Sequence, residues 1–178
     1  MNSIFYGKKN RFVGWTGYEA DEPVIKGLDG LGNSNPLWVQ KWFKKIVIEI
    51  TRHPETRFKV VPQMLREAFS DLDKGNINPD MEVRYTQRLK HYAHEYNEHV
   101  RTGILAKLLY KDKGDLVYWY ETLPTMTNGK SFSIIPKNLN LEKYKLFLLK
   151  KLSDTLEISG FNILDLKSQL LQKVSVVH

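Results

Sequence analysis

The sequence predicts an α+β fold that is mainly α, with about five helices, a small β-hairpin and an irregular N-terminal arm. Three observations predict it: five segments with apolar residues at three- and four-residue spacing, two short aromatic and β-branched runs separated by turn residues, and an early cluster of glycines. Apolar residues make up 42% of the 178 residues, which is enough for a packed core. The predicted domains are a glycine-rich N-terminal arm over residues 1–35 and a single globular domain over residues 36–178.

The arm leads into a first helix. Six of the eleven glycines lie between residues 7 and 32, which predicts short extended pieces joined by turns. Asn35 is a suitable N-cap and Pro36 suits the first helical position, while Pro54 ends the segment. One side of this helix is apolar and aromatic. The other side is basic and is a candidate contact for a polyanion, with Lys41, Lys44, Lys45 and Arg52.

A second helix is expected from Pro62 to about Asp73, with Gly75 near its C-terminal cap. The segment from Asp71 to Glu82 superficially resembles an EF-hand loop. Its glycine stands at position 5 where a calcium loop needs it at 6, and its apolar residue stands at 7 where a calcium loop needs it at 8. We therefore expect an ordinary turn between helices.

A third helix is expected from about Pro79, and it carries three of the five histidines within nine residues. At 100° per residue, tyrosines such as Tyr85, Tyr92 and Tyr96 form one stripe, which predicts a buried face. The opposite face is the candidate interface or pH-responsive surface, because unperturbed histidines titrate between about pH 6 and 7; it carries His91, His94, Glu95, Glu98 and His99. A metal centre is the alternative, and a kink or a new short helix is expected at Gly103.

The hairpin is expected from Leu116 to Leu123 and from Ser131 to Ile135, because Pro124 and the pair Asn128-Gly129 supply the turn. Two helices follow. Asn140 caps the first, which Gly160 ends, and Asn162 with Asp165 resembles a capping box for a last helix that reaches Val174.

Several function classes lack their signatures. The chain has no cysteine, which excludes disulfides, thiolate zinc sites and cysteine nucleophiles. The glycines of residues 27–35 match no phosphate-binding motif, and no nuclease or serine-hydrolase motif is present. We therefore assign no catalytic residue, cofactor or metal, and an enzyme is only the second alternative. No apolar run is long enough for a membrane span and no signal peptide is evident, so a cytoplasmic or virion location is expected.

The net charge of +7 calls for a polyanionic partner to be considered. The excess is spread along the chain, and twenty lysines against seven arginines weaken the case for specific phosphate or base recognition. The predicted function is therefore a non-enzymatic assembly or adaptor subunit of a larger complex, such as a phage neck or tail, whose partners are other protein subunits. The alternative is a basic module that binds DNA or RNA.

Overall fold

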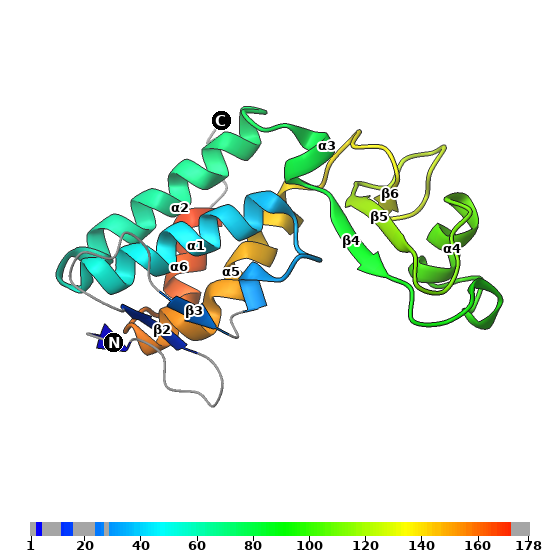
Figure 1. Ribbon diagram of the computed structural model, residues 1–178. Coiled ribbons are helices and arrows are strands. Elements are labelled where there is room, and N and C mark those ends of the chain that lie inside the picture. The colour runs from blue at the N-terminus through cyan, green and yellow to red at the C-terminus, as the bar shows by residue number, and fades with distance from the viewer. Residues whose placement is uncertain (1–2, 5–11, 16–23, 27–28, 172–178) are drawn as a thin grey trace, which may run out of the picture.

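The computed structural model describes residues 3–4, 12–15, 24–26 and 29–171, with side chains from residue 30 onward. Its fold is α+β and mainly α, as the sequence predicts. One part, here called the helical lobe, consists of α1 (Leu37–Arg52), α2 (Arg57–Asp73), α5 (Leu141–Ile158) and α6 (Ile163–Leu171). The other part, here called the β-lobe, spans residues 84–140. Figure 1 shows the two lobes meeting at β4 (Tyr85–Arg88), just after the short helix α3 (Pro79–Glu82).

The helical lobe forms around α1, which packs against α2 and α5. Its buried side chains recur at helical spacing, and each fully buried aliphatic side chain stabilises the fold by about 1.5–3 kcal/mol. Trp38 of α1 lies 6.5 Å from Phe69 of α2, measured between ring centroids. The apolar face that the sequence predicts for the first helix is therefore the core of this lobe; it consists of Trp38, Val39, Trp42, Phe43, Ile46, Val47 and Ile50.

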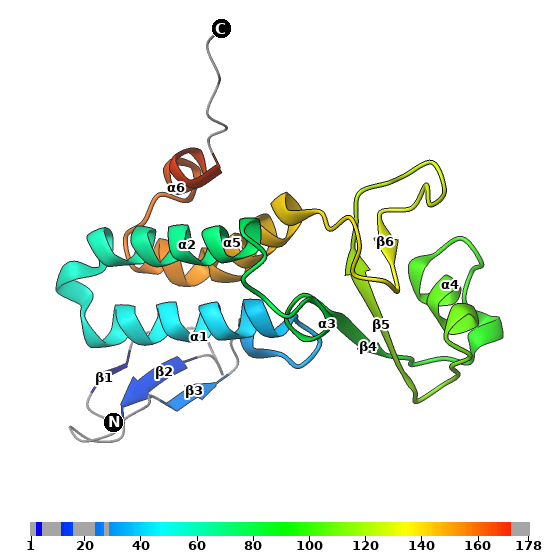
Figure 2. The same cartoon turned by 90° about the horizontal axis from the view of Figure 1, so that it is seen from above.

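The N-terminal arm supplies three short strands, β1 (Ser3–Ile4), β2 (Phe12–Trp15) and β3 (Val24–Lys26). They pair antiparallel in the order β1-β2-β3, so the predicted extended pieces form a small sheet. In Figure 2 this sheet lies on the side of α1 away from α2. A 3₁₀ turn (Asp29–Leu31) then joins the arm to α1.

The β-lobe contains a second antiparallel sheet with the order β4-β5-β6. The predicted hairpin is confirmed as β5 (Leu116–Glu121) and β6 (Phe132–Ser133), which pair through Tyr120 and Ser133. Strand β4 pairs with the other edge of β5, where Tyr85 lies opposite Trp119. The helix α4 (Arg101–Leu108) is the new short helix expected near Gly103, and it contacts β5.

The predicted histidine helix is wrong. Residues 85–88 form β4, and the histidines follow in a loop with a single 3₁₀ turn (Ala93–Glu95). The reason is tertiary: the Tyr85 ring stacks on Trp119 at 5.3 Å, and Leu89 is buried beside the same sheet. Contacts to a neighbouring strand thus override helical spacing in the local sequence.

Other boundaries differ by a few residues. The second helix begins at Arg57 instead of Pro62, which stands inside it and is buried. The N-cap position of α1 is Pro36, not Asn35. The turn expected after α2 is present, and Gly75 takes a φ of +71° there. None of the described helices is both long and apolar enough to cross a membrane.

The last two helices agree with their predicted caps. The Asn140 side chain accepts a hydrogen bond from the Lys143 N–H, and Gly160 ends α5 with a φ of +93°. The Asn162 side chain accepts a hydrogen bond from the Asp165 N–H at the start of α6. Val174 lies outside the described residues.

Candidate functional site

A pocket of ≈ 340 Å³ lies where the two lobes meet, and we call it the junction pocket. Its walls come from the loop before α1 and from β4, α4, β5 and α5. Three of its lining residues lie near helix starts, since Asn35 precedes α1, Arg101 opens α4 and Lys143 lies in the first turn of α5. The lining residues are Ser34, Asn35, Tyr85, Thr86, Gln87, Arg101, Trp119, Glu121, Lys143 and Phe147.

Glu121 is the buried charge of the junction pocket, with 5% of its surface exposed. Its Oε2 atom lies 2.9 Å from Lys143 Nζ, and its Oε1 atom lies 3.8 Å from Arg101 Nη1. The Glu121 backbone is held as well, because its N–H donates to the Tyr144 hydroxyl and its carbonyl accepts from the Asn140 N–H. The carboxylate is thus fixed between two cations that belong to different helices.

Aromatic rings form the apolar side of the junction pocket. The Arg101 guanidinium lies 4.2 Å from the centre of the Trp119 ring, a distance that suits a cation–π contact. The Tyr85 ring stacks on Trp119 and meets Phe147 edge-on at 5.3 Å. Burial raises the pKa of the Tyr85 phenol well above its usual range. The pocket therefore offers flat apolar surfaces beside two cations and one anion.

The β-lobe also carries more than half of the exposed large apolar side chains of the described residues. Eight of the fourteen large apolar side chains that are exposed there belong to residues 84–140, although this segment holds well under half of the described residues. Tyr110 is the clearest case, since 95% of its surface is exposed. A second pocket, of ≈ 420 Å³, opens in the same lobe between Leu123 and Ile135. The eight are Tyr92, Val100, Leu108, Tyr110, Leu116, Leu123, Met126 and Ile135.

The predicted histidine surface lies in the β-lobe, on a loop and not on a helix. His94 stacks on Tyr92 and His91 meets Tyr96 edge-on, each pair at 5.8 Å. On a helix, His91 and Glu95 would lie one turn apart, as would His94 and Glu98, but neither pair forms an ion pair on this loop. Glu95 instead accepts a hydrogen bond from the Tyr92 N–H, and Glu98 Oε1 lies 3.6 Å from His99 Nε2. Within the part of the chain that the structure describes, no three His, Cys, Asp or Glu side chains converge in a way that could hold a metal ion.

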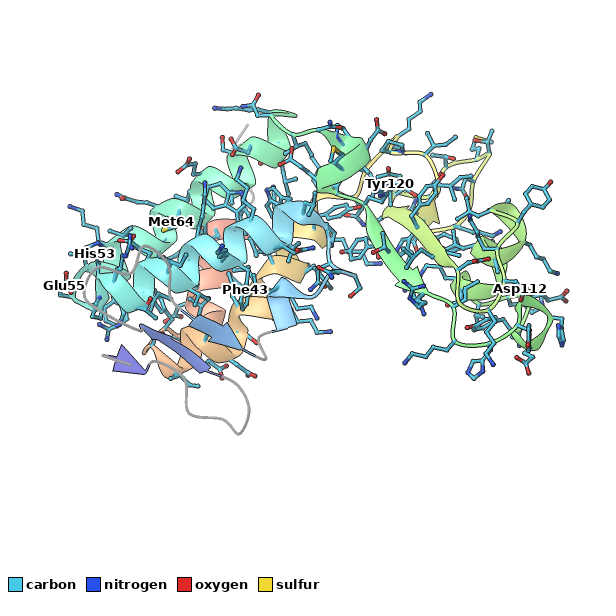
Figure 3. The ribbon with its side chains drawn as sticks, in the orientation of Figure 1. Phe43, His53, Glu55, Met64, Asp112 and Tyr120 are labelled. Atoms are coloured by element: carbon cyan, nitrogen blue, oxygen red, sulfur yellow. The ribbon has the colours of Figure 1, made fainter. Side chains whose placement is uncertain are left out.

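Asp112 anchors this loop at the tip of the β-lobe, far from the helical lobe (Figure 3). Its carboxylate accepts hydrogen bonds from the N–H groups of Ala93 and Lys113, at 2.7 Å and 2.9 Å. These two bonds lower the pKa of the Asp112 carboxyl below its ordinary value. The histidines are therefore displayed on a loop that is tied down at its base.

The four basic residues predicted on the first helix do share one side of α1. Lys41, Lys45 and Arg52 are exposed and Lys44 is half-buried. The Lys45 ammonium lies 4.7 Å from the centre of the Trp42 ring, so part of this basic side covers the core. Acidic residues balance it, because residues 29–83 carry eight basic and eight acidic groups.

The positive charge is concentrated elsewhere. Residues 84–140 carry nine lysines and arginines against five acidic residues, which is +4 of the net charge of +7. When the chain is divided by lobe, the excess is uneven, since residues 29–83 carry no net charge. Three of the seven arginines, Arg84, Arg88 and Arg101, belong to this segment.

Sequence reasoning missed Arg101, Glu121 and Lys143 as members of one site. A signal for Glu121 was present, because it alternates with Trp119 and Val117 on the inward side of the predicted strand, where a charged residue needs a partner. The partners could not be read from the sequence, since they stand 20 and 22 residues away on other elements. A comparison with protein-family models and a comparison with curated proteins each find no match to this chain.

Proposed function

We propose that the chain is a non-enzymatic assembly or adaptor subunit that docks on another protein subunit through the β-lobe. The observation that carries the proposal is the concentration of exposed apolar side chains on residues 84–140. Protein interfaces are enriched in aromatic residues and methionine, and exposed apolar patches mark such interfaces. A virion particle of the phage neck or tail type, or a cytoplasmic complex, is the proposed setting.

Two features favour docking over a merely irregular surface. Tyr110 holds its exposed ring on a backbone with a φ of +53°, a conformation that costs energy for a tyrosine. Met126 lies at the turn between β5 and β6 and is also exposed. Exposed methionine and tyrosine side chains are both common in protein-binding surfaces.

The proposal is tested by size-exclusion chromatography with light scattering, recorded together with the 260/280 absorbance ratio. We expect a species heavier than the 20.8 kDa monomer, or a complex of fixed stoichiometry with a subunit from the same source. Combining Tyr110→Asn with Met126→Ser should weaken that association by at least about tenfold, because central aromatic and apolar anchors carry most interface energy. Asparagine is chosen at 110 because it tolerates a positive φ.

The matched control is Leu164→Ser, which removes an exposed apolar side chain from α6 in the helical lobe. It should leave the association unchanged. A monomer without a stoichiometric partner, or equal loss in the control and the double variant, would contradict docking through the β-lobe.

A nucleic-acid-binding module is the second candidate function, and the specific observation in its favour is the +4 charge of residues 84–140. This function predicts a raised 260/280 absorbance ratio. It also predicts that the logarithm of the binding constant falls linearly with the logarithm of the salt concentration, with a slope of roughly one per phosphate contact. Lys→Glu changes at Lys41, Lys44 and Lys45 test the predicted basic helix face, and Arg84→Glu with Arg88→Glu tests the β-lobe. Association that barely depends on salt would speak for the assembly subunit.

A further inference from the structure

We infer that the junction pocket binds a carboxylate group, supplied by an acidic side chain of the protein on which this subunit docks. The identity of the carboxylate's source rests on the proposed function, whereas the pocket's preference for a carboxylate does not. The inference is carried by the electrostatics of the pocket, by an unused buried donor and by the buried charge of Glu121.

The positive character of the junction pocket has two origins. Arg101 and Lys143 present their cationic groups there with 41% and 48% of each side chain exposed, so both can turn part of their hydrogen-bonding capacity to a ligand. Arg101 and Lys143 also belong to the first turns of α4 and α5, where the positive end of each helix dipole favours an anion.

Trp119 gives the second, independent observation. It lines the pocket with only 5% of its surface exposed, and its buried Nε1–H finds no acceptor within the described residues. A buried donor without an acceptor is costly, and buried polar groups are normally paired. An anionic oxygen entering the pocket would provide that acceptor.

The charge of Glu121 selects the kind of anion. The two cations and one carboxylate leave a net charge of about +1, which a single carboxylate neutralises. A phosphate dianion would leave the pocket with a net negative charge, which is costly beside the buried Glu121. The flat rings of Tyr85 and Phe147 add apolar surface for the stem of an acidic side chain. An acidic protein segment therefore fits this pocket better than a nucleic-acid backbone.

The test uses N-acetyl-glutamate amide as the probe, and its neutral analogue N-acetyl-glutamine amide as the reference. Binding is followed on the full chain by NMR, through the indole N–H resonance of Trp119, which the variant Trp119→Phe identifies among the four tryptophans. We expect a saturable shift with the glutamate probe and none with the glutamine probe. Arg101→Met and Lys143→Met should each weaken binding by about tenfold, because each removes a charge-assisted hydrogen bond.

Two lysines serve as matched controls. Lys107→Met on α4 and Lys150→Met on α5 remove exposed cations that do not line the pocket, and they should leave the affinity unchanged. Glu121→Gln is the decisive variant, since it removes the competing carboxylate. It should tighten glutamate binding several-fold, whereas a purely structural ion pair predicts no gain.

The outcomes separate the two proposals. Equal shifts with both probes, no shift at all, unchanged affinity in the Arg101 and Lys143 variants, or no gain in Glu121→Gln would overturn the carboxylate site. Tighter binding of inorganic phosphate or of an oligothymidylate would overturn the choice of carboxylate and favour nucleic acid. None of these results alters the association test with Tyr110→Asn and Met126→Ser, which addresses the proposed function.

Discussion

Replacing Tyr144 with phenylalanine is expected to lower the free energy of unfolding by about 2–4 kcal/mol. The Tyr144 hydroxyl lies in the buried seam between the lobes, where it donates to the Val83 carbonyl at 2.6 Å and accepts from the Glu121 N–H at 2.9 Å. Phenylalanine keeps the ring and its packing against Tyr85, but it leaves both backbone groups buried without a partner. Urea denaturation of the full chain measures the loss.

Tyr110→Phe is the control for this variant, because the exposed Tyr110 side chain should lose its hydroxyl at no measurable cost. A second readout locates the effect: amide hydrogen exchange of Glu121 should accelerate in Tyr144→Phe, since that N–H loses its acceptor. Equal stability of the two variants would show that the seam does not depend on this hydroxyl.

Replacing Gly30 with alanine is expected to lower the free energy of unfolding by about 2–3 kcal/mol. A Cβ atom at Gly30 would lie 2.1–2.6 Å from three ring atoms of Phe43, which is far inside van der Waals contact. Phe43 belongs to the buried core, with 1% of its surface exposed, so its ring has little room to move away. Thermal or urea denaturation measures the loss.

The double variant Gly30→Ala with Phe43→Leu tests the cause. Phe43→Leu alone should destabilise the protein by leaving a gap, but in the double variant the added methyl group occupies part of that space, so the two losses should be less than additive. Gly129→Ala is the matched control, because a Cβ there meets no described atom within 4 Å. Additive losses, or a loss at Gly129 equal to that at Gly30, would contradict the close packing of Gly30 on Phe43.

The helices that the sequence predicts correctly are those with strong local signals at both ends. α5 has Asn140 as an N-cap and Gly160 beyond its C-terminus, and its apolar residues recur on one face. The hairpin likewise has β-branched and aromatic strands around a turn. In such segments the intrinsic propensity, the apolar pattern and the capping or turn residues all predict the same element. Contacts with neighbouring elements are then not needed to determine it.

The helix predicted for the histidine segment is wrong for the opposite reason. Its tyrosines recur at helical spacing, yet residues four apart, such as Tyr85 and Leu89, also point to the same side of an extended segment. Strand β5 decides between the helix and the strand, because β4 pairs with its edge and its Trp119 side chain stacks on Tyr85. A pairing between residues more than thirty positions apart leaves no mark in a local window.

The glycine loop before the first helix is a second case in which the local sequence leaves the structural role open. Its glycines are compatible with a turn, a linker or an anion cradle when only the sequence is considered. The structure shows that Gly30 is needed because the Phe43 ring occupies the place of a side chain. Only a contact across thirteen residues reveals this role.

The sequence by itself determined the mainly α composition, the apolar face of α1, the caps of the last two helices and the lack of familiar catalytic motifs. These features depend on neighbouring residues and on hydrogen bonds within one segment. The tertiary structure decided that the histidines lie on a loop, that the excess charge gathers in the β-lobe, and that Arg101, Glu121 and Lys143 share a pocket. Burial and charge pairing depend on segments brought together by folding, and local spacing carries no information about which segments meet.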